Sequence, residues 1–287
     1  MLAAETPTQS TRSEIEPGAQ KDTQIDRYEL KFVVDPKIVP GIREFIQPFV
    51  NRDNNGIGDI PEYIVTTLQL DSPNATLHYA KERKAYSRFK LRIRTYGTDG
   101  QCPYFLEIKR KVNTMILKSR AILPPSDYRR ENILHPRTLI PFKSKSETLN
   151  YLEFVRLTNQ VGGRPAVFIR YIRESYKGTS ESYSRVTLDR SITYRPARSQ
   201  WEFPHTEPRW YKLDTQTSLR REFPGYILEL KSGAELPEWM AELIERFNLV
   251  RTGFCKYSAA MRLESIFSGR QYGPASENCS YEDGSDF

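Results

Sequence analysis

The chain has 287 residues and a formal net charge of +7, with 43 Lys and Arg against 36 Asp and Glu. No stretch of the sequence approaches the run of about 18 apolar residues that a membrane-spanning helix needs, and the N-terminus lacks the pattern of a signal peptide. A cytoplasmic protein without a membrane span of its own is therefore expected. The three cysteines, Cys102, Cys255 and Cys279, have no CxxC spacing, which argues against a disulfide framework or a zinc site.

The two ends of the chain differ in composition from its centre. Residues 1–25 and 269–287 are rich in Ser, Thr, Gly, Pro and acidic residues, which predicts disordered tails around one domain at 26–268. Between the tails, 40 basic and 28 acidic side chains give a charge of +12. This excess predicts an anionic partner, which at this level is nucleic acid, an acidic lipid or a phosphorylated small molecule.

Alternating apolar residues predict eight strands, and apolar residues at helical spacing predict four helices. In chain order these are a strand at 26–34, a helix at 36–50, strands at 63–71, 88–96, 104–112 and 115–123, a helix at 146–161, strands at 166–174, 183–190 and 225–231, and helices at 237–247 and 253–267. Many antiparallel strands with a few helices predict an α+β fold, in which helices wrap a barrel or a sandwich.

Several predicted strands carry apolar residues on one face and mainly basic residues on the other, because residues two apart share a face. For example, Leu91 and Ile93 lie opposite Arg92 and Arg94. The other charged faces carry Glu29 and Lys31; Glu107, Lys109 and Lys111; Lys118 and Arg120; Arg185, Thr187 and Asp189; and Glu229 and Lys231.

These charged faces have two interpretations. The simpler one is a half-exposed sheet with a solvated face, but solvated faces usually mix the two signs of charge. Like charges on neighbouring strands repel unless an anion lies between them. An eight-stranded antiparallel β-barrel, with helices packed outside and a basic lumen, removes the conflict. Lys and Arg together suit a chain of phosphates, and Glu229, Glu29 and Glu107 are candidate ligands for a divalent cation that bridges phosphate oxygens.

Nine segments of the sequence resemble the polyphosphate polymerase domain of the vacuolar transporter chaperone (VTC) complex, within the triphosphate tunnel metalloenzymes. They occur in the family's order over about residues 26 to 264 and read RYELKFVV, TTLQLDSP, KLRIRTYG, YFLEIKRK, LKSRAIL, IRYIRESY, SRVTLDRSITY, YILELKS and RTGFCKYSAAM. The resemblance implies an eight-stranded tunnel that takes the triphosphate of ATP into its lumen. With Mn²⁺ or Mg²⁺, the γ-phosphate would pass to a growing polyphosphate chain.

The resemblance also implies roles for individual residues. The groups that neutralise the transferring phosphate would be Arg92, Arg94, Lys118 and Arg173, and Glu229 would hold the metal. The phosphate-binding bases would be Lys31, Lys109 or Lys111, Arg185 and Lys256, with hydroxyl contacts from Tyr171 and Ser258. Without the resemblance, Lys256 is typical of a surface lysine, and Glu229 of a salt-bridge partner for Lys231 or a base on a neighbouring strand.

Two features depart from the wider superfamily. Its hydrolases begin with the pattern ExExK, and Arg27 stands where the first glutamate would be. Fewer lumen carboxylates favour transfer to phosphate over hydrolysis. The inositol-phosphate-sensing segment and the membrane region of the eukaryotic complex have no counterpart in this sequence, so a regulatory or membrane-protein partner would be a separate chain.

Three alternatives to a polymerase stay open. A tunnel triphosphatase would release orthophosphate, a nucleotide cyclase would release a cyclic nucleotide, and a non-catalytic protein would only bind polyphosphate or nucleic acid. Nucleic-acid binding predicts basic side chains on an outer surface, interleaved with exposed aromatic residues. The inward placement of the bases argues against it, so we expect ATP and polyphosphate rather than nucleic acid as partners.

Overall fold

The computed structural model describes residues 28–269, except 54, 55, 57, 58, 114, 137–139, 181, 182, 207, 208, 222 and 223. The predicted tails at 1–25 and beyond Gly269 therefore lie outside the described residues. The fold is α+β, and all eight predicted strands are confirmed to within a few residues at most boundaries. No helix in the described part of the chain is long and apolar enough to cross a membrane.

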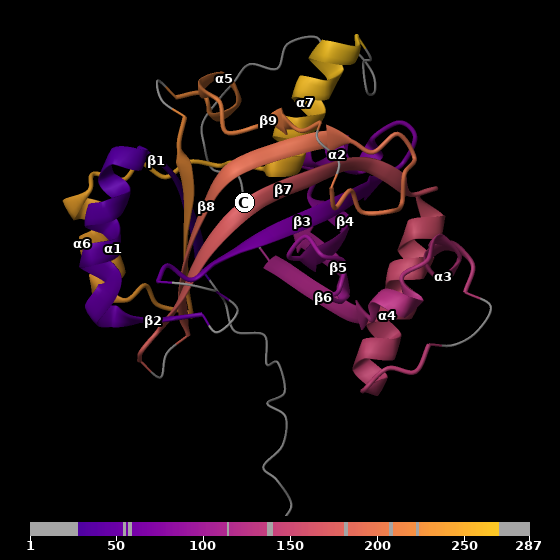
Figure 1. Ribbon diagram of the computed structural model, residues 1–287, viewed down its shortest axis with the longest axis horizontal. Helices are drawn as coiled ribbons and strands as arrows, with labels where there is room; N and C mark the ends of the chain where they lie inside the picture. Colours follow the sequence, from indigo (N-terminus) through magenta and orange to yellow (C-terminus); the bar gives the residue numbers. More distant parts are fainter. Residues whose placement is uncertain are drawn as a thin grey trace, which may run out of the picture.

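The strands form one antiparallel sheet. They are β1 (Tyr28–Val34), β2 (Val50–Arg52), β3 (Glu62–Asp71), β4 (Ser87–Tyr96), β5 (Tyr104–Val112), β6 (Met115–Leu123), β7 (Arg164–Gly178), β8 (Ser184–Pro196), β9 (Tyr211–Lys212) and β10 (Tyr226–Ser232). The long strands follow the order β1-β10-β8-β7-β3-β4-β5-β6, while the short β2 and β9 pair with β7 and β8. The sheet bends into an arch that runs from β1 on one side to β6 on the other (Figure 1).

The prediction of a closed barrel is wrong in one respect. Among the described residues, β1 and β6 are the two ends of the strand order and no ladder of hydrogen bonds joins them. Alternation of residue types shows which face of a strand is buried, but it does not show whether the first and last strands of a sheet meet. The structure is therefore an arched sheet around a cavity, with an open side between β1 and β6.

The helices are α1 (Val39–Ile46), α2 (Thr76–Glu82), α3 (Arg130–Leu134), α4 (Lys145–Gln160), α5 (Gln216–Leu219), α6 (Glu238–Arg246) and α7 (Lys256–Ser268). Short 3₁₀ turns at Pro36–Ile38 and Gln47–Phe49 flank α1. Helices α1 and α6 lie together on one side of the molecule, and α3 and α4 lie on the other (Figure 1). The four predicted helices correspond to α1, α4, α6 and α7.

Apolar packing on the convex face of the sheet fixes the direction of the charged side chains. Phe32, Leu188 and Leu228 pack in one cluster with residues of α1 and α6, while Leu91 and Leu106 pack in another with residues of α4. Because neighbouring residues of a strand point to opposite faces, the charged residues between them point to the concave face.

Helix α7 departs from the expected arrangement of helices outside the sheet. Ala260 and Met261 of this helix pack in a third cluster with Val65 of β3 and Ile169 of β7. Both Ile169 and the start of α7 line the cavity. Helix α7 therefore forms part of the cavity wall instead of covering its outside.

Candidate phosphate-binding site

The concave face of the sheet surrounds a cavity of about 710 Å³. Its lining includes thirteen Lys and Arg side chains and four Asp and Glu side chains. These come from seven strands, from α2, from the first turn of α7 and from the connecting segments. Such an excess of like charge in one concave surface is unfavourable unless an anion balances it, so the cavity has the electrostatics of a polyanion site.

One wall of the cavity carries a cluster of three arginines around a single carboxylate, the Glu107 cluster. Arg92 Nε donates to Glu107 Oε2 at 2.5 Å, Arg120 Nε donates to Oε1 at 3.0 Å, and Arg94 Nη2 lies 3.8 Å from Oε2. Burial alone would raise the pKa of Glu107, but Arg92, Arg94 and Arg120 outweigh it and hold that pKa far below its usual range. The cluster carries two net positive charges.

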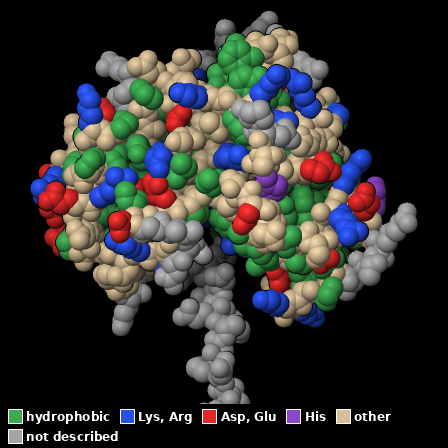
Figure 2. Space-filling model, in the orientation of Figure 1, with side chains coloured by type: hydrophobic (Ala, Val, Ile, Leu, Met, Phe, Trp, Pro, Cys, Tyr) green, Lys and Arg blue, Asp and Glu red, His purple; other side chains and the backbone are tan. Residues whose placement is uncertain are grey.

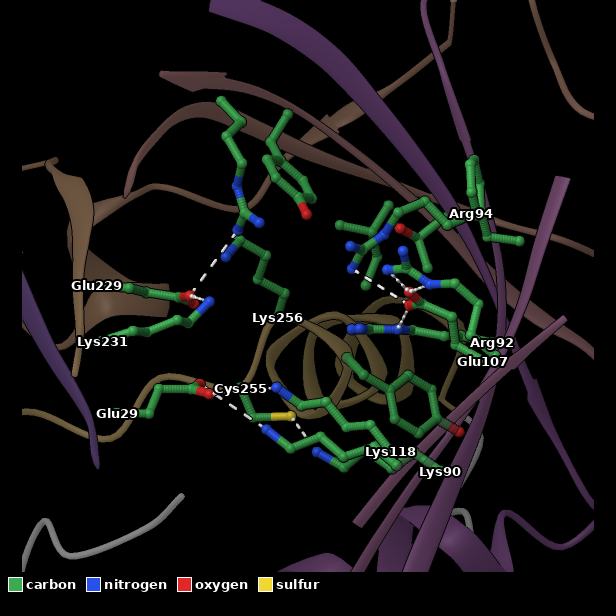
Figure 3. A pocket seen from close by; sticks show the side chains of 18 of the residues that line it. Glu29, Lys90, Arg92, Arg94, Glu107, Lys118, Glu229, Lys231, Cys255 and Lys256 are labelled. Atoms are coloured by element: carbon green, nitrogen blue, oxygen red, sulfur yellow. Dashed lines mark hydrogen bonds and ion pairs between the residues drawn. The ribbon is translucent and has the colours of Figure 1, made fainter. Parts of the chain in front are cut away.

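The opposite wall carries a chain of alternating charges, the Glu229 cluster, which consists of Glu29, Lys31, Arg173, Asp189, Glu229, Lys231 and Lys256. Figure 3 labels Glu29, Glu229, Lys231 and Lys256 of this cluster. Lys231 Nζ lies 2.8 Å from Glu229 Oε2, Lys31 Nζ lies 3.5 Å from Oε1, and Arg173 Nη2 lies 4.0 Å from Oε2. Burial alone would raise the pKa of Glu229, but the surrounding bases hold it well below its usual range. This wall is closer to neutral than the wall of the Glu107 cluster.

Asp189 joins α7 to the sheet at this wall. It is fully buried, and it accepts from Arg173 Nε at 2.7 Å, from Arg173 Nη2 at 2.8 Å and from Lys256 Nζ at 2.6 Å. Arg173 and Lys256 also lie over the ring of Tyr171, with its centroid 5.2 Å and 4.8 Å away. The position of Lys256 therefore depends on a carboxylate of β8 and a ring of β7.

Two lysines near the open side, Lys109 and Lys118, have a lowered pKa. Burial lowers the pKa of Lys109 to about 7, with Lys31 and Lys118 adding to the effect and Glu29 opposing it. Partial enclosure by the cavity, together with Lys231 and Arg92, also lowers the pKa of the more exposed Lys118 to about 8, against the same glutamate. A bound polyanion would stabilise the charged form of both ammonium groups.

Arg94 is a buried base with an unsatisfied hydrogen-bond donor. Only 8% of the residue is exposed, its Nε atom has no hydrogen-bond partner among the described residues, and its contact with Glu107 is long. The hydroxyl of Thr67, which also lines the cavity, is likewise buried without a partner in the described part of the chain. Buried polar groups without a partner are rare in native proteins, and a bound ion or water molecule usually supplies the missing partner.

The structure brings most of the predicted site residues together. Those that line the cavity are Glu29, Lys31, Arg92, Arg94, Glu107, Lys109, Lys118, Tyr171, Arg173, Arg185, Glu229 and Lys256. The sequence left open whether Lys109 or Lys111 binds phosphate. Lys109 lines the cavity, while Lys111 lies further along β5. Ser258 is fully buried in α7 and does not reach the cavity lining. Arg27 lies outside the described residues.

The cavity and its immediate support also contain residues to which the sequence alone assigned no role. Lys90 and Lys231 follow from strand parity and could have been found in that way. Asp189 shares a predicted face with Arg185, but only the fold shows that it contacts α7. Cys255 lies at the start of α7 with its Sγ atom 3.0 Å from Lys90 Nζ. Burial would raise the pKa of this thiol, but Lys90 and Lys81 outweigh it and lower the pKa to about 5.

The carboxylates of the cavity fit a divalent cation only in part. Within the described ranges, no group of three or more His, Cys, Asp or Glu side chains is arranged to hold a metal. Glu107 is engaged by three arginines, whereas Glu29 and Glu229 lie on neighbouring strands with Lys31 between them. Two oxygen donors suit Mn²⁺ or Mg²⁺ if phosphate oxygens complete the coordination. The residues therefore fit a cation that binds together with phosphate.

The site and the fold define a protein with a basic, anion-binding cavity on the concave face of an arched antiparallel sheet. The family profile described as the VTC domain matches residues 26–264. The chain belongs to the VTC domain family, as the resemblance indicated. A comparison with curated proteins finds no match.

Two solved structures are similar to this chain at low sequence identity. The PH1819 protein from Pyrococcus horikoshii OT3 is 13% identical, with a TM-score of 0.41 over 85% of this chain and 100% of that one. A proposed adenylate cyclase from Vibrio parahaemolyticus is 12% identical, with a TM-score of 0.40 over 83% of this chain and 98% of that one. Both similarities are distant.

Proposed function

We propose that this protein is a polyphosphate polymerase, which transfers the γ-phosphate of ATP to a growing polyphosphate chain inside the cavity. Membership of the VTC domain family supports phosphoryl transfer in general terms. The lining, with thirteen bases against four acids, supports a substrate with many negative charges close together. A linear phosphate chain has this charge density.

The observation that carries the proposal is the state of Arg94. Its guanidinium is buried, its Nε atom has no partner in the described part of the chain, and it lines the cavity near Arg92 and Glu107 (Figure 3). A guanidinium offers paired donors that match the oxygens of a phosphate. A phosphate group bound here would satisfy the unpaired donor and neutralise the excess charge at once.

The mechanism depends on neutralising the negative charge of the transferred phosphate more than on transferring a proton. In phosphoryl transfer the charge of the transition state is spread over the equatorial oxygens of the transferred group. We assign this neutralisation to Arg92, Arg94 and Lys118 from one wall and to Arg173 from the other. The other phosphate groups of the nucleotide and of the acceptor chain would be held by Lys31, Lys109, Tyr171, Arg185 and Lys256.

The proposed metal ligands are Glu229 and, beside it, Glu29. A bound Mn²⁺ or Mg²⁺ would add positive charge between phosphate oxygens, which polarises the bond to the leaving group. The three arginines around Glu107 make this residue a holder of guanidinium groups rather than a metal ligand. Its task would be to keep Arg92, Arg94 and Arg120 at one place despite their mutual repulsion.

The outer surface supports this proposal over nucleic-acid binding. On the face shown in Figure 2, basic and acidic side chains are interspersed, and no continuous basic stripe crosses the molecule. Nucleic-acid binding usually relies on such a stripe.

The test is incubation of the purified protein with ATP and MnCl₂, followed by sizing of the phosphate products on a gel. A ladder of polyphosphate is expected, and it should disappear in the Arg94→Met variant. Release of orthophosphate alone would identify a triphosphatase, and a cyclic nucleotide would identify a cyclase. If polyphosphate binds but ATP is not turned over, the protein is a polyphosphate-binding protein without catalytic activity.

A further inference from the structure

The open side of the arch lies between β1 and β6. Each of these strands has one neighbouring strand in the sheet among the described residues. On β1, Phe32 bridges to Arg251 and the Lys31 carbonyl accepts from Thr252 N, so the outer edge is open only at Tyr28–Leu30. On β6, the end near α4 is covered, since Glu147 accepts from the backbone of Ile122 and Asn150 donates to the carbonyl of Arg120. The opening therefore lies at Met115–Ser119.

Ion pairs span this opening instead of backbone hydrogen bonds. The carboxylate of Glu29 on β1 lies 3.8 Å from Lys109 Nζ and 3.9 Å from Lys118 Nζ. Both distances are long for ion pairs, and Glu29 also contacts Lys31 on its own strand. Contacts of this kind exchange readily with other anions, in contrast to a continuous β-ladder.

Exposure of the cavity-lining bases shows that the opening reaches solvent. The side chain of Lys118 is 57% exposed and that of Arg120 is 49% exposed, although both line the cavity. On the inner walls, the side chains of Arg94 and Arg173 are only 9% and 11% exposed. The bases therefore form a graded path from the edge of β6 to the buried centre.

We propose that a linear polyphosphate enters and leaves the cavity sideways, through the opening between β1 and β6. Lys109, Lys118 and Arg120 bind the chain at this opening, and the chain displaces Glu29 as the anion paired with the two lysines. No covalent bond changes in this step. The proposal rests on the proposed function, because it assumes that the cavity binds polyphosphate.

Sideways entry has a physical basis and a functional consequence. Replacing one carboxylate by several phosphates at Lys109 and Lys118 exchanges one anion for another, so no ammonium group is left without a counter-charge. A closed tunnel admits only the end of a chain, whereas an open side admits an interior segment. The protein would thus bind long polyphosphate without first finding one of its ends.

The test uses long polyphosphate whose terminal phosphates carry a bulky folded protein on neither end, on one end or on both ends. Binding of each chain to the intact protein is measured by fluorescence anisotropy. We expect all three chains to bind with similar affinity, and Lys118→Met to weaken the binding of all three. The Arg94→Met variant controls for binding on the outer surface, since Arg94 is buried in the cavity.

Each outcome decides between the two proposals. Loss of binding for the doubly blocked chain alone would show entry by the chain end and overturn sideways entry, while the proposed function stands. Binding of the doubly blocked chain that survives Arg94→Met would show surface binding and would also overturn it. Failure of all three chains to bind would overturn the proposed function itself.

Discussion

Asp189 is the buried anion that Arg173 and Lys256 share, so we expect removal of its charge to destabilise the protein. Asp189→Asn keeps the size of the side chain but leaves two buried cations without their counter-charge. Breaking a buried ion pair in this way lowers the free energy of unfolding by about 3 kcal/mol. Tripolyphosphate should restore part of that stability, because its charge replaces the lost carboxylate.

Thermal unfolding with and without tripolyphosphate measures this effect. The upward shift of Tm should be larger in Asp189→Asn than in the wild type. A residue with a purely structural role in the core would lower both melting temperatures equally. Equal shifts of Tm in the two proteins would therefore show that Asp189 does not contribute to the anion site.

Cys255 gives a prediction about reactivity. Lys90 and Lys81 overcome the effect of burial and lower the pKa of Cys255 to about 5, whereas burial and Asp99 raise the pKa of Cys102. At mildly acidic pH, iodoacetamide should alkylate Cys255 much faster than Cys102 in a Cys279→Ser background, because the thiolate is the nucleophile. Peptide mass spectrometry follows both sites in one sample.

A variant of Lys90 supplies the control for this experiment. Lys90→Met removes the ammonium group 3.0 Å from the sulfur, so the alkylation rate of Cys255 should fall and its pH midpoint should rise. Tripolyphosphate should slow the reaction in the wild type by filling the cavity. Equal rates at Cys102 and Cys255 would contradict the electrostatics described for this end of the cavity.

A variant of Glu229 distinguishes metal binding from anion binding. Glu229→Gln keeps the size of the side chain but loses the charge that attracts a divalent cation, so turnover should collapse. Binding of tripolyphosphate without metal should survive or tighten, because one negative charge leaves an anion site. Titration of activity with Mn²⁺ measures the effect, and an unchanged half-saturation with a near-normal rate would exclude Glu229 as a ligand.

At the scale of elements, α1 is joined to the back of the site by a partly buried ion pair. Arg43 donates to both oxygens of Glu174 on β7, at 2.9 and 2.7 Å, and Tyr176 Oη donates to the same carboxylate at 2.6 Å. Glu174 is fully buried and points away from the cavity. Arg43→Met should lower the free energy of unfolding by about 2 kcal/mol, since a buried carboxylate loses its charged partner.

Chemical denaturation measures the stability of this variant, and Arg156→Met on α4 is the matched control. Arg156 pairs with Glu153 on the exposed surface, so its loss should change stability little. Tripolyphosphate affinity should be unchanged in both variants. A loss of affinity in Arg43→Met would show that α1 contributes to the geometry of the cavity.

The strands were predictable from sequence because burial imposes a strict alternation on them. Leu91 and Ile93 need an apolar neighbour, which turns Arg92 and Arg94 toward the cavity whatever the order of the strands. Helices α2, α3 and α5 were missed because they have seven, five and four residues, too few to display a helical period. The role of α7 was missed because it depends on contacts with distant strands.

At the scale of the whole molecule, the sequence could not predict the open side. Closure of a sheet depends on its curvature and on which strands lie at its edges, and neither is encoded in the pattern of one strand. The same holds for Asp189, whose two partners lie 16 and 67 residues away along the chain. The sequence thus predicted which residues face the cavity better than it predicted which of them touch.

The central claim is that the cavity is a site for a linear chain of phosphates, with Arg94 at its centre. Calorimetric titration of the wild type and of Arg94→Met with tripolyphosphate tests this claim most directly. One chain should bind per protein in the wild type, more tightly than sulfate, and binding should be lost or strongly weakened in a variant that remains folded. Equal binding of tripolyphosphate to both proteins, or equal affinity for sulfate, would contradict it.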